Sequence, residues 1–208
     1  MNITKIGVHH FAGDYTLSQV NNSHKQRWPD FPSKLRPDLY IGYTIIIWKD
    51  GSWLQTRFIG EETAAAKGAN LEAIHIALDG NFSVIKPTWA QRETLKRMLI
   101  QLVNNTLSEF RVLPNTTVKV SKESIFPHRK MGVTITDCYG ALLPDDWAKV
   151  ATFGVEPIKP LPIVSEGPEL TRLQKIVEVL KQLIETYILM NKVKLGTVYR
   201  GCGGDMRG

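Results

Sequence analysis

Short apolar runs that alternate with capped helix patterns constrain the fold of the first 154 residues more than any other feature. Residues 73–78 form an apolar run that ends at Asp79-Gly80, which is typical of a buried strand followed by a turn. A helix is predicted soon afterwards, because Thr88 and Gln91 have the spacing of a capping box. Its apolar face is formed by Leu95, Met98, Leu99 and Leu102, and it extends to about Asn105.

The same alternation continues on both sides of this strand–helix pair. Lys49-Asp50-Gly51 is a turn signal between two apolar runs and predicts a hairpin. The other predicted elements are strands at 3–8, 40–48, 52–58 and 117–120, helices at 16–27 and 145–150, and a loop or short helix at 61–69. This order predicts an α/β domain over residues 1–154, with a central mixed β-sheet flanked by helices.

The composition changes after residue 154. Residues 155–168 contain four prolines and predict a stiff linker. An amphipathic, coiled-coil-like helix is predicted within 169–208, ahead of a glycine-rich tail. Its apolar seam is Leu173, Ile176, Leu180, Leu183, Tyr187 and Met190. Homo-oligomerisation through this helix is the preferred interpretation; docking on the first domain and association with a cell wall are the alternatives.

Composition narrows the class of protein. The net charge of +6 is spread evenly along the chain, and basic residues do not cluster with aromatic ones, so nucleic-acid binding is not indicated. No apolar run is long enough to cross a bilayer, and no secretory signal is visible, which predicts synthesis in the cytoplasm. Two distant cysteines do not make a disulfide framework.

Two places concentrate residues with metal-binding or catalytic chemistry. His9 and His10 end the first strand, and since neighbouring strand residues point to opposite faces, only one of them can serve a given site. Residues 126–140 bring His128 and Cys138 into one loop-rich segment, and imidazole with thiolate suits Zn²⁺. The residues alone also permit a strand end with one core and one surface histidine, and a buried thiol with a surface histidine.

Six segments, in order, resemble the zinc-dependent N-acetylmuramoyl-L-alanine amidases that share a fold with peptidoglycan recognition proteins, a group that contains many phage endolysins. The segments are VHHFAG, SHKQRW, IGYTIIIWKDGSWLQTR, AAAKGANLEAIHIALDGNF, PTWAQ and PHRKMGVTITDCYG. The resemblance covers about 150 residues, and their common order makes coincidence an unsatisfactory explanation.

The resemblance implies a Zn²⁺ site and its ligands, which are His9, His128 and Cys138. It implies that Tyr43 lines the site, to position or deprotonate water or to donate to an oxyanion, and that Thr136 offers a second hydrogen bond there. Tyr43 as a core aromatic residue and Thr136 as a turn hydroxyl are the alternatives. Asn70 is a candidate substrate-binding residue or the cap of a turn.

The chain also departs from the family pattern. Ala65 and Thr44 stand where relatives often have histidines, and Tyr139 replaces the proline that usually follows the cysteine. The loop between the two later ligands is two residues longer than usual. All three implied ligands are nevertheless present, which favours an enzyme over a binding protein.

The implied reaction is hydrolysis of the amide bond between N-acetylmuramic acid and the L-alanine of the stem peptide in peptidoglycan, by a zinc-activated water. A phage or prophage endolysin fits best, since it accumulates in the host cytoplasm without a signal peptide and reaches the wall after release. The alternatives are a non-catalytic peptidoglycan-binding module and a cytoplasmic amidase that recycles muropeptides.

Overall fold

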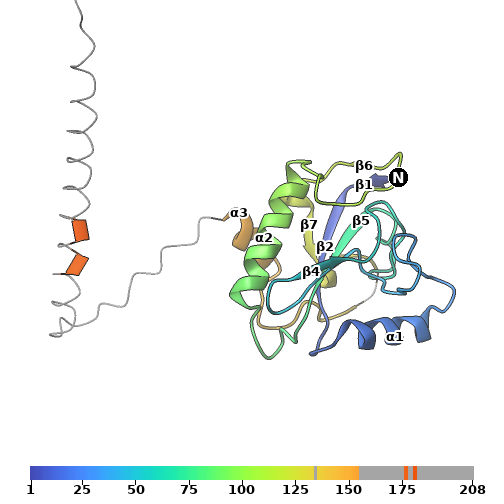
Figure 1. Ribbon diagram of the computed structural model, residues 1–208, viewed down its shortest axis with the longest axis horizontal. Coiled ribbons are helices and arrows are strands. Elements are labelled where there is room, and N and C mark those ends of the chain that lie inside the picture. Colours follow the sequence, from blue (N-terminus) through green and yellow to red (C-terminus); the bar gives the residue numbers. More distant parts are fainter. Residues whose placement is uncertain (134, 155–175, 178–179, 182–208) are drawn as a thin grey trace, which may run out of the picture. The chain divides into compact units, whose positions relative to one another are not determined.

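A five-stranded mixed sheet organises the first unit of the chain, Met1–Glu156, in a computed structural model (Figure 1). The structure describes residues 1–133, 135–154, 176–177 and 180–181. The strand order is β4-β3-β5-β2-β7. The strands are β2 (Lys5–His10), β3 (Ile45–Ile47), β4 (Trp53–Gln55), β5 (Ala73–Leu78) and β7 (Ile125–Pro127). β4 is antiparallel to β3 and the other neighbours are parallel, so the predicted mixed sheet is confirmed.

Smaller elements complete the unit. A separate two-stranded sheet pairs β1 (Asn2–Ile3) with β6 (Thr117–Val118). The helices are α1 (Leu17–Arg27), α2 (Trp89–Val103) and α3 (Trp147–Phe153), and the 3₁₀ turns are η1 (Lys122–Ser124) and η2 (His128–Lys130). None of the helices in the described part of the chain has the length and apolar content that a membrane span requires.

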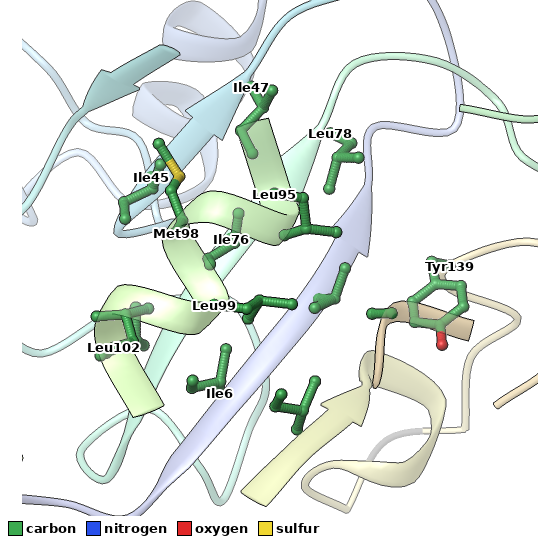
Figure 2. Packing of buried hydrophobic residues seen from close by; sticks show 14 of the residues in the cluster. Ile6, Ile45, Ile47, Ile76, Leu78, Leu95, Met98, Leu99, Leu102 and Tyr139 are labelled. Carbon is green, nitrogen blue, oxygen red and sulfur yellow. The ribbon is translucent and has the colours of Figure 1, made fainter. Parts of the chain in front are cut away.

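Helix α2 covers one face of the sheet and holds the main core. Thr88 caps it through the predicted capping box with Gln91, whose side chain also donates to the carbonyls of Ile47 in β3 and of Asp79, the residue after β5. Figure 2 shows the apolar side chains of α2 directed at the strands. The labelled side chains of α2 are Leu95, Met98, Leu99 and Leu102, and they share one buried cluster with the labelled strand residues Ile6, Ile45, Ile47, Ile76 and Leu78. All are at most 2% exposed, so this face is a closed apolar core.

Helix α1 lies on the other face of the sheet (Figure 1). Thr16 caps it by a second capping box, and Val20 packs with Ile46 of β3, whose neighbours Ile45 and Ile47 face α2. After β4, Arg57 and Glu61 form a buried ion pair, with 2.7 Å between nitrogen and oxygen. This pair fastens the segment between α1 and β3, because the Arg57 guanidinium donates to the carbonyls of Phe31 and Ile41, and Glu61 accepts from the backbone N–H of Lys34. The Arg57 guanidinium also stacks over Phe31 at 4.1 Å, which ties that segment to the hairpin.

Observed strands are shorter than predicted where the backbone hydrogen bonds depart from the regular pattern of the β-sheet. The predicted strand 40–48 is reduced to Ile45–Ile47, and just before it the Thr44 carbonyl accepts from the backbone N–H groups of both Thr56 and Arg57, which departs from regular strand pairing. β7 was not predicted. The predicted linker at 155–168 and most of the helix within 169–208 lie outside the described residues. Ile176 and Leu180 of the predicted seam are helical and about half exposed, and the oligomer stays a prediction.

Candidate metal centre

The three implied ligands meet where two parallel strands end. His9 is the fifth residue of β2, and His128 follows β7 directly. The register pairs Val8 with Pro127, so the next residue on each strand, His9 and His128, falls at the same level of the sheet. Their ring centroids are 4.5 Å apart. Neighbouring strands therefore place these two imidazoles together from residues 119 positions apart.

Cys138 reaches the same point from the loop after β7. Its Sγ lies 4.0 Å from Nδ1 of His9 and 3.3 Å from the backbone nitrogen of His10. His9, His128 and Cys138 each offer one ligand atom, and these three atoms lie within 4.8 Å of one another. The cluster could therefore hold a metal ion. His10 points to the opposite face, where its Nδ1 accepts from Phe82 N–H at 3.0 Å. The two adjacent histidines thus have separate roles.

Electrostatics keep the metal-free ligands neutral. Burial, and then the neighbouring imidazoles of His75 and His128, lower the pKa of His9 well below its usual value. Burial also lowers the pKa of His128 and raises the pKa of Cys138 to about 12, the latter opposed by the His10 N–H and by Arg129. Neutral imidazoles are ready to bind a cation, whereas the thiol must lose its proton when a metal binds.

The cysteine loop is fastened by residues with no predicted role. The Arg129 backbone N–H donates to the Cys138 carbonyl at 2.8 Å, and its guanidinium donates to the carbonyls of Gly140 and Leu143. Tyr139 is 1% exposed, and its hydroxyl donates to the backbone carbonyl of Asp145 at 2.8 Å. Tyr139 therefore anchors the loop where relatives have proline.

Tyr43 borders the centre from the start of the hairpin. Its ring lies 5.2 Å from that of His9 and 5.5 Å from that of His24 on α1. His24 is held by accepting from Gly42 N–H at 2.9 Å. Burial, and then the electrostatic influence of Cys138, raise the pKa of Tyr43 above its usual value.

The other two predicted site residues make local bonds. Thr136 Oγ1 accepts from Cys138 N–H at 3.2 Å, which is the turn role that the sequence left open. Asn70 Oδ1 accepts from the backbone N–H groups of Ala65 and Ala66 at 3.0 and 2.8 Å. This carbonyl oxygen is committed to the turn, and substrate contacts by Thr136 and Asn70 stay predictions.

A groove lies along α1, and Tyr43, whose ring lies 5.2 Å from that of His9, is part of its lining. Its volume is about 320 Å³, and its lining includes Phe11, Tyr15, Ser23, Arg27 and Tyr43. No acidic residue lines it, and Arg27 forms no ion pair with any residue that the structure describes. The groove therefore offers one exposed cation, Arg27, to a ligand.

One residue close to the centre was missed by the sequence analysis. His75, in the middle of β5, places its Nδ1 2.8 Å from Nε2 of His9. The available signal was a single histidine in the otherwise aliphatic strand AIHIAL. The pairing of β5 with β2, which gives this histidine its neighbour, is a tertiary contact that strand patterns alone do not reveal.

Comparison with solved structures defines the class of protein. The N-acetylmuramoyl-L-alanine amidase LysC from Clostridium intestinale URNW is 26% identical with a TM-score of 0.50, over 69% of this chain and 80% of that chain. The Ph2119 endolysin from the Thermus scotoductus MAT2119 bacteriophage Ph2119 is 20% identical with a TM-score of 0.52, over 74% and 86%. A chain in the ectodomain complex of peptidoglycan recognition proteins LCa and LCx is 19% identical with a TM-score of 0.50, over 74% of this chain and 83% of that chain.

These matches place the chain in the structural superfamily of type 2 amidases and peptidoglycan recognition proteins, as its motifs predicted. Of the three structures described, the one with 26% identity is an amidase. No protein-family model and no curated protein sequence matches the chain.

Proposed function

We propose that this protein is a peptidoglycan hydrolase that cleaves the amide bond between N-acetylmuramic acid and the L-alanine of the stem peptide. The observation that carries the proposal is the cluster of His9, His128 and Cys138 at the ends of two adjacent parallel strands. A solved amidase with the same fold and 26% identity supports the same chemistry.

The donor set suits Zn²⁺ as the cofactor. Two neutral imidazoles and one thiolate are ligands that zinc accepts in a tetrahedral site, and three protein ligands leave a fourth position for water or substrate. When bound, zinc supplies Lewis-acid polarisation of a carbonyl and lowers the pKa of a bound water toward neutrality. In this chain, His9 and His128 would hold the ion from rigid strand ends, and Cys138 from the loop fastened by Arg129 and Tyr139.

Tyr43 is proposed to act as a hydrogen-bond donor rather than as a base. Because burial raises its pKa above the usual value, its hydroxyl is protonated at neutral pH. A neutral hydroxyl beside the cluster can donate to the oxyanion that develops when the scissile carbonyl is attacked. Thr136 is proposed to add a second hydrogen bond, and Asn70 to contact substrate through its side-chain amide nitrogen.

The groove along α1 is proposed to receive the stem peptide. Peptidoglycan stem peptides carry free carboxylates, and a groove with Arg27 and no acidic lining residue favours an anionic ligand. The tyrosines and Phe11 supply apolar surface for the methyl groups and peptide planes.

The endolysin role, with synthesis in the host cytoplasm and action on the wall after release, is proposed for the whole chain. The fold match to the Ph2119 endolysin agrees with this role. Self-association through the helix predicted within 169–208 would add wall avidity, because linked binding sites raise the local concentration of each other.

Mass spectrometry of purified peptidoglycan tests the proposal. We expect the wild type to release stem peptides with new L-alanine N-termini and to contain about one zinc per chain, as a three-ligand site implies. Cys138→Ser should release none and contain little zinc. Intact wall in both samples, with protein bound to it, would instead establish a non-catalytic recognition module. Activity on soluble muropeptides alone would favour a recycling amidase.

A further inference from the structure

His75 occupies a place that is built around it. It lies in β5 with its side chain on the same face of the sheet as His9, and it is 0% exposed. The register pairs it with Gly7 of β2, where an added Cβ would lie only 2.7 Å from the Nδ1 atom of His75. The absence of a side chain at position 7 thus leaves room for the imidazole directly beside the metal centre.

The two nitrogens of His9 face different partners. Nδ1 faces Sγ of Cys138 at 4.0 Å, and Nε2 faces Nδ1 of His75 at 2.8 Å. A neutral imidazole carries one N–H, so a His9 that binds a metal through Nδ1 must carry its proton on Nε2. That N–H is fully buried and needs an acceptor, and the only side-chain acceptor hydrogen-bonded to it among the described residues is His75 Nδ1.

We propose that His75 is a positioning residue for the metal centre, whose Nδ1 accepts the Nε2–H of His9 and so fixes the ring orientation and the tautomer that leave His9 Nδ1 free to bind the metal. The inference rests on the metal site of the proposed function. Hydrogen bonds to the second nitrogen of a metal-bound histidine set the tautomer and raise metal affinity. In this chain an imidazole takes the place of the usual carboxylate or backbone carbonyl.

The other nitrogen of His75 argues against a purely structural role. When Nδ1 accepts from His9, the proton of His75 resides on Nε2, a buried atom to which the Ala69 backbone offers at most a distorted hydrogen bond. A poorly satisfied buried donor destabilises a fold, whereas an aliphatic residue in this aliphatic strand would not. The hydrogen bond that His75 accepts from His9 therefore explains why a histidine is buried at this position.

Zinc affinity, measured by competition with a chromogenic chelator, tests the inference in the full-length chain. We expect His75→Leu, which removes the acceptor, to weaken zinc binding about 10- to 100-fold. His75→Asn places an amide oxygen near the position of Nδ1 and should recover most of the affinity. Ile76→Val is the matched control, since it perturbs the same strand on its α2 face and should leave zinc affinity unchanged.

A measurement on the wild type protects the test from variants that fail to fold. In ¹⁵N spectra of histidine-labelled, zinc-loaded protein, His9 should show a protonated Nε2 and a metal-bound Nδ1. A proton on Nδ1 of His9, equal zinc affinity for His75→Leu and wild type, or equal weakness of His75→Asn and His75→Leu would each overturn the inference while leaving the zinc site standing. A wild type that binds no zinc would overturn the metal site and the inference together.

Discussion

The two faces of the central sheet use the same strands for different purposes. The residues of β2 and β5 that are directed at α2 are aliphatic, except for His10 at the end of β2. They form a core that excludes water. The residues directed at the other face include Gly7, His9 and His75, which are small or ionisable. Because side chains alternate along a strand, each strand serves stability on one face and the metal centre on the other. Changes on the two faces should therefore have separable effects.

Removing the metal should have the largest effect, and only on function. Chelation should lower amide hydrolysis on the order of 1,000-fold or more, because a metal supplies several kcal/mol of transition-state stabilisation and each 1.36 kcal/mol is tenfold in rate. Added zinc should restore the activity. Far-ultraviolet circular dichroism should be unchanged by chelation, since the α2 core has no part in the site. Loss of the native spectrum on chelation would show that the two faces are not separable.

Truncation on the α2 face should do the reverse. Leu99 is 0% exposed, and Leu99→Ala should lower the free energy of unfolding by about 2–5 kcal/mol through lost burial and a residual cavity. Urea denaturation measures this change, with the exposed Glu93→Ala on the same helix as a control expected to stay within about 0.5 kcal/mol. The zinc affinity of the folded variant should equal that of the wild type. A loss of zinc affinity alongside the loss of stability would show that the two faces are energetically coupled.

These contrasting faces also explain what the sequence could and could not predict. β5 was predicted with correct bounds because its six residues, five of them apolar, end at Asp79-Gly80, and α2 because Thr88 and Gln91 cap it. Such signals are local. The three-residue β7 carries a proline and a short pattern, so it gave no signal.

The site was predicted unevenly for the same reason. The resemblance supplied the candidate ligands, and the β2–β7 register that brings His9 to His128 is visible only in the fold. His75 was missed because its importance comes from pairing with β2. The turn bonds of Thr136 and Asn70 likewise depend on backbone conformations that residue types alone leave open.

Acid should weaken the side of the molecule that carries the histidines. Burial, followed by the charges of Arg27 and Arg57, lowers the pKa of His24 from 6.5 to about 4. The unfolded chain therefore binds a proton that the folded chain does not between pH 6.5 and 4, and stability falls as the pH drops through this window, by up to about 3 kcal/mol for this group.

His24→Asn tests this acid sensitivity in chelator-treated protein. Asparagine can still accept from Gly42 N–H but does not titrate, so stability should match wild type near pH 7 and fall less steeply below pH 6.5. Part of the slope should remain, because the pKa of His10 is also lowered to about 4. Identical stability profiles for the two proteins would show that His24 does not contribute.

Tyr43→Phe should separate chemistry from metal binding within the site itself. Loss of one preorganised donor to an oxyanion costs on the order of 100-fold in kcat. Zinc affinity should be unchanged, since the Tyr43 hydroxyl is not among the ligands. Tyr40→Phe is a suitable control because Tyr40 does not line the groove. Unchanged kcat for Tyr43→Phe would assign Tyr43 to packing against His9 and His24.

The smallest effect is expected at Arg27, where the groove meets solvent. Arg27→Gln should raise KM for peptidoglycan about tenfold and leave kcat nearly unchanged, because a hydrogen-bonded charge pair contributes about 1.5–3 kcal/mol and solvent screens part of it. Added salt should raise KM more for wild type than for the variant, as the attraction is electrostatic. Lys25→Gln removes the same charge from α1, but Lys25 lies over the Tyr40 ring outside the groove, and its KM should stay near wild type. Equal shifts for the two variants would mean that the general positive charge of the chain, rather than the groove, attracts the wall.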